Sequence, residues 1–177
     1  MKLFLALLLS IPSLLPAQWT TLPVPPANRY DDVFFITDST GWAVASNGQI
    51  LHTTDAGASW DMQTDVEGFL RSIEFATPTL GFCGSLNGKL LRTTDGGEHW
   101  TDIAPDIDPA LPGICGLSAP TPETIYGCGI WSSPAYIIKS TDGGETWTTT
   151  DMSSMASALV DIHFISADTG FDDVGRG

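Results

Sequence analysis

The chain has 177 residues, of which 42% are hydrophobic, 21 are acidic and 7 are basic, and its formal net charge is −14. It is long enough to bury a sizeable core, and a surface of this sign repels the phosphates of nucleic acids and of anionic lipids. We therefore expect no nucleic-acid partner, and we interpret the acidity as a solvated surface.

Residues 1–17 have the features of a secretory signal peptide. Lys2 precedes the apolar run Leu3–Leu9, and the segment ends in the small residue Ala17. The run is short for a bilayer span and is followed by Pro12. We expect a protein exported to the periplasm, the cell surface or the medium, with no membrane span in the mature chain.

Residues 18–30 are interpreted as an orphan outer strand and a linker. Gln18–Thr21 carries a tryptophan near its start, like the later segment Trp147–Thr149, which opens the last strand of a repeated unit. We expect this strand to complete a sheet whose inner strands come from the far C-terminal end of the fold.

Residues 31–67 form the first repeated unit. Short runs rich in β-formers at Val33–Ile36, Gly41–Ala45 and Gln49–Thr53 are followed by a polar, alternating segment, which predicts a four-stranded antiparallel meander. Between the second and third runs, Asn47-Gly48 favours a type I′ turn, in which both central residues have positive φ.

The unit is repeated along the chain. The octapeptide Thr53–Trp60 (TTDAGASW) returns as Thr93–Trp100 (TTDGGEHW) and as Ser140–Trp147 (STDGGETW). A Phe followed six residues later by a Gly marks the same phase in the first, second and last units. The further units are 68–110, 111–155 and, as the truncated start of a fourth, 156–177.

A meander repeated about every 40 residues predicts an all-β fold, a β-propeller of four-stranded antiparallel blades. The alternative is a two-sheet sandwich, whose strands do not repeat one another's turns. About three full blades plus a partial first and last blade in residues 18–177 cannot close a ring of 4 to 8 blades. We therefore expect a fragment of a longer protein; closure by self-association is the alternative.

Each octapeptide places an Asp two residues before a Gly and five before a Trp. The carboxylate can accept main-chain N–H bonds, the Gly supplies positive φ, and the indole can pack while its N–H finds a partner. The pattern resembles the Asp-box, or BNR repeat, a turn between the third and fourth strands. The resemblance implies a structural role for Asp55, Gly57, Trp60, Asp95, Gly97, Trp100, Asp142, Gly144 and Trp147.

The wider unit GWAVASNGQILHTTDAGASW, residues 41–60, resembles the repeats of the Ycf48/HCF136-like family of photosystem II assembly factor-like proteins. The resemblance covers roughly residues 18–177. It implies a non-enzymatic, seven-bladed scaffold that binds another protein. A glycan is the other class of partner that we keep open.

The enzymatic alternative is an Asp-box glycoside hydrolase, similar to a sialidase, whose catalytic residues would lie in the missing C-terminal part. That resemblance implies three arginines that converge on the substrate, with a Tyr and a Glu. The chain has four arginines, Arg29, Arg71, Arg92 and Arg176, of which Arg92 directly precedes an octapeptide. We assign no catalytic residue.

No metal site or cofactor is expected. His52, His99 and His163 are isolated and lack ligand spacing. Cys115 and Cys128 form a candidate disulfide, because strands 114–118 and 125–129 around a turn near residues 121 and 122 would place them opposite each other.

A partner would bind where the loops between blades and the loops between second and third strands share one face, opposite the octapeptides. Arg and aromatic residues dominate binding energy at the centre of an interface. The candidates there are Arg29, Tyr30, Arg71 and Trp131. The alternative is that Trp131 caps its own hairpin and that Arg29 pairs with a neighbouring Asp.

Overall fold

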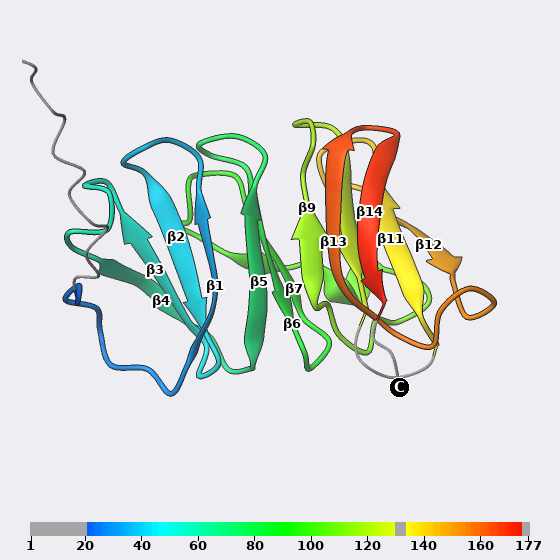
Figure 1. The fold of residues 1–177 in the computed structure, drawn as a ribbon, viewed down its shortest axis with the longest axis horizontal. Helices are drawn as coiled ribbons and strands as arrows, with labels where there is room; N and C mark the ends of the chain where they lie inside the picture. Colours follow the sequence, from blue (N-terminus) through cyan, green and yellow to red (C-terminus); the bar gives the residue numbers. More distant parts are fainter. Residues whose placement is uncertain (1–20, 130–133, 175–177) are drawn as a thin grey trace, which may run out of the picture.

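The computed structural model describes residues 21–129 and 134–174, whose strands form four antiparallel sheets standing side by side (Figure 1). The sheets follow the order of the chain, and the first strands of neighbouring sheets contact each other. This arrangement confirms the predicted fold class, a part of a β-propeller. We call the sheets blades 1 to 4.

Blades 1 to 3 are four-stranded meanders and blade 4 is a hairpin. Blade 1 contains β1 (Tyr30–Phe35), β2 (Gly41–Ala45), β3 (Gln49–Thr53) and β4 (Asp61–Asp65). Blade 2 contains β5 (Leu70–Phe75), β6 (Gly81–Ser85), β7 (Leu90–Thr93) and β8 (Thr101–Asp102). Blade 3 contains β9 (Gly116–Ser118), β10 (Ile125–Cys128), β11 (Tyr136–Ser140) and β12 (Thr148–Asp151). Blade 4 contains β13 (Leu159–Ser166) and β14 (Thr169–Val174).

One short 3-10 helix, η1 (Ala104–Asp106), lies between blades 2 and 3. In the part of the chain that the structure describes, no helix has the length and apolar character needed to cross a membrane. The predicted signal peptide and most of the predicted orphan strand lie outside the described residues.

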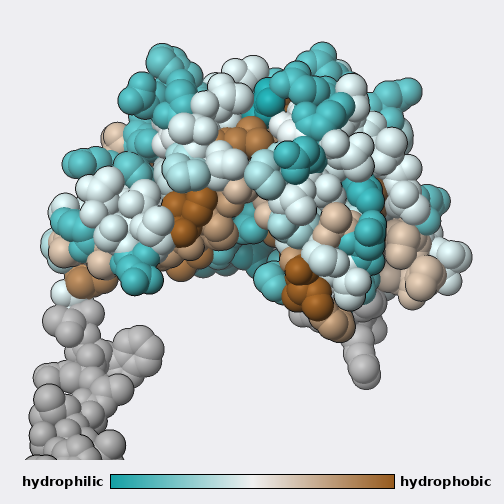
Figure 2. Space-filling view, turned by 90° about the horizontal axis from the view of Figure 1, so that it is seen from above, coloured by the Kyte–Doolittle hydropathy of each residue, from teal (hydrophilic) through white to brown (hydrophobic). Residues whose placement is uncertain are grey.

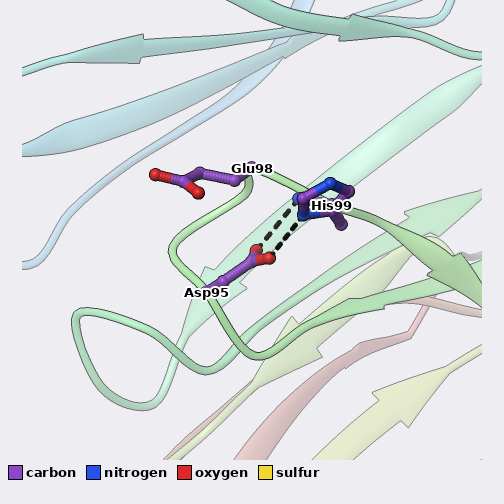
Figure 3. Close-up of side chains that lie close together, drawn as sticks. All are labelled: Asp95, Glu98 and His99. Atoms are coloured by element: carbon purple, nitrogen blue, oxygen red, sulfur yellow. Dashed lines mark hydrogen bonds and ion pairs between the residues drawn. The ribbon is translucent and has the colours of Figure 1, made fainter.

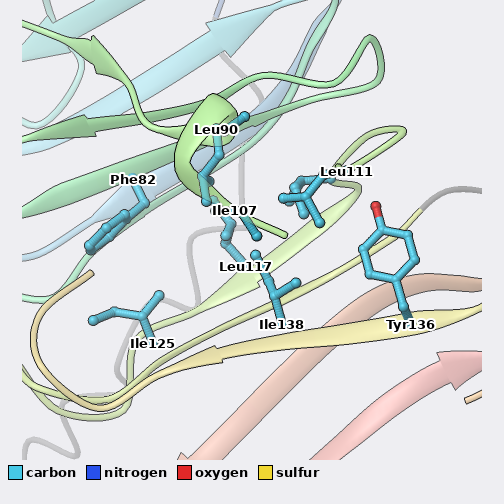
Figure 4. Packing of buried hydrophobic residues seen from close by; sticks show 10 residues of the cluster. Phe82, Leu90, Ile107, Leu111, Leu117, Ile125, Tyr136 and Ile138 are labelled. Carbon is cyan, nitrogen blue, oxygen red and sulfur yellow. The ribbon is translucent and has the colours of Figure 1, made fainter. Parts of the chain in front are cut away.

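The core lies between the blades, where the aromatic ring of one sheet covers the ring of the next. Trp42 of β2 stacks on Phe75 of β5 with ring centroids 3.5 Å apart, and Tyr126 of β10 stacks on Phe164 of β13 at the same distance. Between blades 2 and 3, Phe82 packs with buried aliphatic residues of both sheets (Figure 4).

The Phe–Gly spacing of the repeat has a packing cause. Phe35 lies directly opposite Gly41 and Phe75 opposite Gly81, where each glycine is the first residue of the second strand of its blade. In blade 4, Phe164 lies opposite Gly170, the second residue of β14. A Cβ added at Gly81 would lie 2.5 Å from the Phe75 ring, and one at Gly170 would lie 2.5 Å from the Phe164 ring. Each ring therefore lies flat across a position where only hydrogen fits.

Apolar side chains are exposed at both ends of the stack of blades. Phe35 of blade 1 is 41% exposed, whereas its counterpart Phe75 in blade 2 is 2% exposed. Ile165 and Phe171 of blade 4 are also exposed. Seen from above, the molecule is an arch, and hydrophobic residues are visible on both of its arms beside the hollow (Figure 2).

The hairpin turn of blade 1 differs from the prediction. Only Gly48 of the Asn47-Gly48 pair has positive φ, at 92°, and its N–H donates to the carbonyl of Ala45 at 3.0 Å. Three residues, not two, separate β2 from β3. A three-residue loop needs one left-handed residue at its end, whereas type I′ needs two.

The candidate disulfide is absent, and the predicted register is wrong by one residue. Cys128 lies opposite Gly116, not opposite Cys115. Cys115 precedes β9, and its N–H donates to the carbonyl of Cys128 at 2.9 Å. All three cysteines are buried free thiols, and burial raises the pKa of Cys115 to about 11 and that of Cys128 to about 12.

Candidate functional site

The carboxylates of the octapeptides close the turns in which they lie. Asp142 accepts the Ser140 hydroxyl at 2.8 Å and the Thr146 N–H at 2.9 Å on Oδ1, and the Thr146 hydroxyl at 2.5 Å on Oδ2. The N–H of Gly144, whose φ is 83°, donates to the Ser140 hydroxyl at 2.8 Å. Both oxygens of Asp142 are therefore engaged within its own turn.

Asp55 and Asp95 close their turns in the same way, with Thr in place of Ser140 and with Ser59 and His99 in place of Thr146. Asp55 accepts the Thr53 hydroxyl at 2.8 Å, and Asp95 accepts the Thr93 hydroxyl at 2.8 Å. These hydrogen bonds favour the ionised form and lower the pKa of Asp55, Asp95 and Asp142 to about 2. Carboxyls of this kind are poor proton donors near neutral pH.

The predicted partner for the indole N–H is found in one turn of three. The N–H of Trp147 donates to the Gly144 carbonyl at 3.2 Å. Trp60 and Trp100 have no partner for this group within the described residues, although Trp100 lies edge-on to Phe75 and Trp60 edge-on to Phe35. The tryptophans therefore act mainly through ring packing.

The turn of blade 2 also brings Asp95, Glu98 and His99 together, with potential metal-ligating atoms within 4.8 Å of one another. Figure 3 shows the two bonds from His99 to Asp95, one from the ring nitrogen Nδ1 at 2.8 Å and one from the backbone N–H at 2.9 Å. Asp95 raises the pKa of His99 through these contacts. All three residues are exposed, and turn formation accounts for the arrangement without an ion.

A polar pocket of about 140 Å³ lies where the first strands of the four blades meet. We call it the inner pocket. In blades 1, 2 and 4 the register of the first strand shifts at this level, so an extra residue enters the pocket wall. The pocket is lined by Asp31, Asp32, Arg71, Ser72, Cys115, Leu117, Val160 and Asp161.

Asp31 links two of the predicted binding residues at the rim of the inner pocket. Its side chain is 1% exposed, and its Oδ1 accepts a bond from Arg29 Nε at 3.0 Å and lies 3.6 Å from Arg71 Nη1. Arg29 itself is 58% exposed, and its guanidinium lies 5.3 Å from the centre of the Phe69 ring. Arg29 does pair with a neighbouring Asp, and it also presents a cation beside an aromatic ring.

The other two predicted binding residues do not join this group. Tyr30 is partly buried, and its hydroxyl donates to the Pro25 carbonyl. Trp131 lies outside the described residues. The part of the face that the structure describes therefore consists of Arg29, Phe69 and Arg71 around Asp31.

Each pair of neighbouring blades is joined by one bond from a backbone N–H to a side chain of the first strand. Asp32 accepts a bond from the Ile73 N–H at 2.9 Å, and Glu74 accepts one from the Ala119 N–H at 3.3 Å. The Ser118 hydroxyl accepts one from the Phe164 N–H at 2.9 Å. Burial raises the pKa of Glu74 to about 7, and it also raises the pKa of Asp32. The acidic residues beside the inner pocket thus connect blades.

Sequence reasoning missed Asp31, Asp32 and Asp161. The first strands can be aligned on Phe35, Phe75 and Phe164. In that alignment Asp31 lies four residues before the Phe, and Asp32 and Asp161 lie three residues before it. Because the first strands of a propeller face its centre, such adjacent positions predict a shared pocket.

The fold and the octapeptide turns define the class of protein, a β-propeller built from repeats with an Asp-Gly-Trp turn after the third strand. Within that class, the family described as photosynthesis system II assembly factor YCF48 matches residues 11–125. The chain belongs to this family. No curated protein matched the chain.

Solved structures support the same fold. The structure of YCF48 bound to D1 peptide is 26% identical, covers 80% of this chain and has a TM-score of 0.65. YCF48 from Cyanidioschyzon merolae is 22% identical, covers 82% of the chain and has a TM-score of 0.68. An ancestral GH74 enzyme is 16% identical, covers 82% of the chain and has a TM-score of 0.64.

The chain spans about half the length of the two YCF48 structures, 47% and 50%, and 22% of the GH74 enzyme. Its similarity to the enzyme is a similarity of fold, because repeated blades superpose whether or not they carry a catalytic site.

Proposed function

We propose that this protein is an exported, non-enzymatic propeller that binds another protein as an assembly scaffold. The observation that carries the proposal is the exposed Arg29, which lies over the half-buried ring of Phe69 beside Arg71, on a chain that belongs to the YCF48 family. One member of that family has been solved with a D1 peptide bound. We extend only the class of partner, a protein segment, to this chain.

The chemistry of the face supports binding more than catalysis. Arg29 and Arg71 are two of only seven basic residues in an acidic protein, and one carboxylate, Asp31, lies against both. Arg92, by contrast, binds Glu145 with its Nη2 2.6 Å from Oε1. The described arginines therefore do not converge on one substrate site, as a sialidase would require.

A glycoside hydrolase is the second candidate, for one reason. Burial raises the pKa of Glu74 to about 7, and the charges of Asp32 and Asp161 add to this shift; a carboxyl with a raised pKa is typical of the general acid of a glycosidase. Against this, Glu74 already accepts the Ala119 N–H between blades 2 and 3. We therefore assign Glu74 to blade packing.

Site-specific photo-cross-linking tests the proposal. Phe69 is replaced by p-benzoylphenylalanine, which keeps an aromatic ring beside Arg29, and the protein is irradiated in the cells that produce it. We expect one dominant protein adduct, identified by mass spectrometry, and no adduct when the same residue is placed at exposed Met62 of β4.

The enzymatic candidate is tested in parallel with xyloglucan and a fluorogenic sialoside as substrates. Turnover that disappears in Glu74→Gln while the protein stays folded would overturn the scaffold proposal. A dominant adduct at position 69 without turnover supports it.

A further inference from the structure

The repeat brings polar side chains of different blades together in the inner pocket. The first strands β1, β5, β9 and β13 stand in this order across the molecule (Figure 1). Asp32, Ser72 and Asp161 each lie three residues before the phenylalanine of their strand, and all three line the pocket. Every lining residue comes from blades 1 to 4, so the pocket is a site of this chain.

Two buried polar atoms in the pocket wall have no hydrogen-bond partner within the described residues. Ser72 is 3% exposed, and its hydroxyl is one of these atoms. The other is Oδ2 of Asp31, whose side chain is 1% exposed and whose Oδ1 accepts the bond from Arg29. Buried polar groups are nearly always paired in folded proteins. The wall therefore offers hydrogen bonds that the described part of the protein does not itself use.

The charge of the wall favours a cation. Asp31, Asp32 and Asp161 line the pocket, against a single basic residue, Arg71. Among the described residues, neither Asp32 nor Asp161 forms an ion pair. Burial raises the pKa of Asp32, and the charge of Asp161 raises it further, as expected for two carboxylates that face each other without a cation between them.

The spacing of these carboxylates favours an organic cation over a metal ion. In the described ranges, the only three potential metal ligands whose atoms lie within 4.8 Å of one another are those of Asp95, Glu98 and His99. The three carboxylates of the inner pocket are therefore too far apart to surround one metal ion, whose ligand oxygens lie within about 2.6 Å of it.

The size and the apolar part of the wall narrow the class of cation. Leu117 and Val160 line the pocket beside the acids. The volume of about 140 Å³ corresponds to about four or five water molecules in the liquid. This space fits a short aliphatic chain with one charged end, and it is too small for a sugar ring or a nucleotide.

We propose that the inner pocket binds a primary alkylammonium group. The charge lies near Asp161 and Asp32, and one N–H donates to the Ser72 hydroxyl. The alkyl stem lies on Leu117 and Val160. An ammonium group has three N–H donors and no acceptor, and a stem of this kind packs on apolar atoms while its head stays among polar ones.

The alkylammonium can be the end of a lysine side chain or a free amine. Asp31 and Arg71 belong both to the pocket and to the face around Arg29. A lysine of a protein segment on that face can therefore reach the pocket, and in this form the inference rests on the proposed function. A free amine would bind without any partner protein.

Titration with n-butylammonium chloride at constant ionic strength, followed by ¹H–¹⁵N NMR, tests the proposal. We expect saturable shifts of the amide signals of Ser72 and Asp161. Two controls separate the parts of the ligand: n-butanol has the stem without the charge, and tetramethylammonium has the charge without an N–H. Each should bind about tenfold more weakly or less, because hydrogen bonds to a charged group are stronger than neutral ones.

Three variants locate the site. Ser72→Ala removes a hydroxyl that has no partner within the described residues, so it should stay folded and bind n-butylammonium about tenfold more weakly. Asp161→Asn removes an exposed charge and should weaken binding about two- to fivefold. Asp38→Asn removes the same charge from an exposed position between β1 and β2, and should leave the affinity unchanged.

The yield of the cross-link from position 69 in Ser72→Ala separates the two sources. A lower yield assigns the ammonium group to a lysine of the partner, whereas an unchanged yield with n-butylammonium binding assigns it to a free amine. Absence of any cross-link in the protein with Ser72 in place would refute the proposed function and leave the titration result standing.

Absence of saturable shifts at Ser72 and Asp161 would overturn the proposal, because the pocket would then hold water alone. Equal binding of n-butanol or tetramethylammonium, or an affinity unchanged in both Ser72→Ala and Asp161→Asn, would overturn it as well. Shifts of the same signals with calcium chloride but not with n-butylammonium would assign the pocket to a metal ion instead.

Discussion

At the scale of single residues, the acidic side chains of the octapeptides have a complete structural role. Asp142 binds Ser140 and Thr146, and Asp95 binds Thr93 and His99, all within one turn. Sequence alone predicted this use of the carboxylate and the glycine, because both follow from local turn chemistry. It did not predict which indole N–H groups would find a partner, since that depends on how closely the ring approaches a carbonyl.

We predict that Asp142→Asn lowers the melting temperature at neutral pH and weakens the acid dependence of stability. The folded-state pKa of Asp142 is about 2, below its ordinary value of 3.8. The ionised form therefore stabilises the fold above pH 4, and this contribution is lost as the pH falls toward 2.

Thermal unfolding between pH 2 and 7 checks the prediction. The melting temperatures of the two proteins should converge as the pH approaches 2. Parallel curves across the whole range would mean that Asp142 is not held by its turn.

For Glu74 the pH dependence of stability has the opposite sign. Burial raises its folded-state pKa from 4.5 to about 7, so ionisation destabilises the fold as the pH rises through this interval. The penalty at pH 8 is on the order of 3 kcal/mol at most. Glu74→Gln keeps an acceptor for the Ala119 N–H and should raise stability at pH 8 but not at pH 4. Urea unfolding at both pH values measures this, and a variant that is less stable at pH 8 contradicts it.

At the scale of strands and sheets, the unit of stability is the contact between neighbouring blades. The Phe–Gly spacing was visible in the sequence because blades 1, 2 and 4 repeat the same cross-strand contact. The register of Cys128 against Gly116 was not visible, because the sequence does not fix the centre of the loop between β9 and β10, which the observed pairs place at residue 122. The register shifts beside the inner pocket were not visible either, because they depend on tertiary packing, although the acids themselves could have been found by aligning the first strands.

We predict that Trp42→Ala destabilises the protein by about 3–5 kcal/mol, as expected for removing a buried aromatic ring. Trp42 is 1% exposed and lies on Phe75. Exposed Phe171 supplies a control, because Phe171→Ala leaves the core intact. Chemical denaturation compares the two. A loss below about 1 kcal/mol for Trp42→Ala would show that the stacked rings do not hold blades 1 and 2 together.

At the scale of the whole molecule, sequence repeats predicted the propeller because each complete blade has the same turn between its third and fourth strands and blades 1, 2 and 4 share the Phe–Gly contact. The function could be predicted less completely from the sequence. The proposed binding face combines Arg29 and Phe69, which precede the first strands of different blades, and nothing in the repeat pairs them. Export is a separate proposal that rests on residues 1–17.

Export has a direct chemical readout. If residues 1–17 are a signal peptide, protein recovered from outside the cytoplasm begins at Gln18. N-terminal sequencing of the exported protein identifies that residue. Recovery of uncleaved protein in the cytoplasm alone would contradict the proposal.

The central claim is that the octapeptide carboxylates hold turns while the Arg29 face holds a partner. The most direct test compares the yield of the cross-link from position 69 in two further variants, Arg29→Ala and Asp142→Asn, at a temperature where both are folded. We predict that Arg29→Ala lowers the yield without changing the melting temperature, and that Asp142→Asn lowers the melting temperature without changing the yield. The reverse pattern, with the yield lost in Asp142→Asn and kept in Arg29→Ala, would contradict the account.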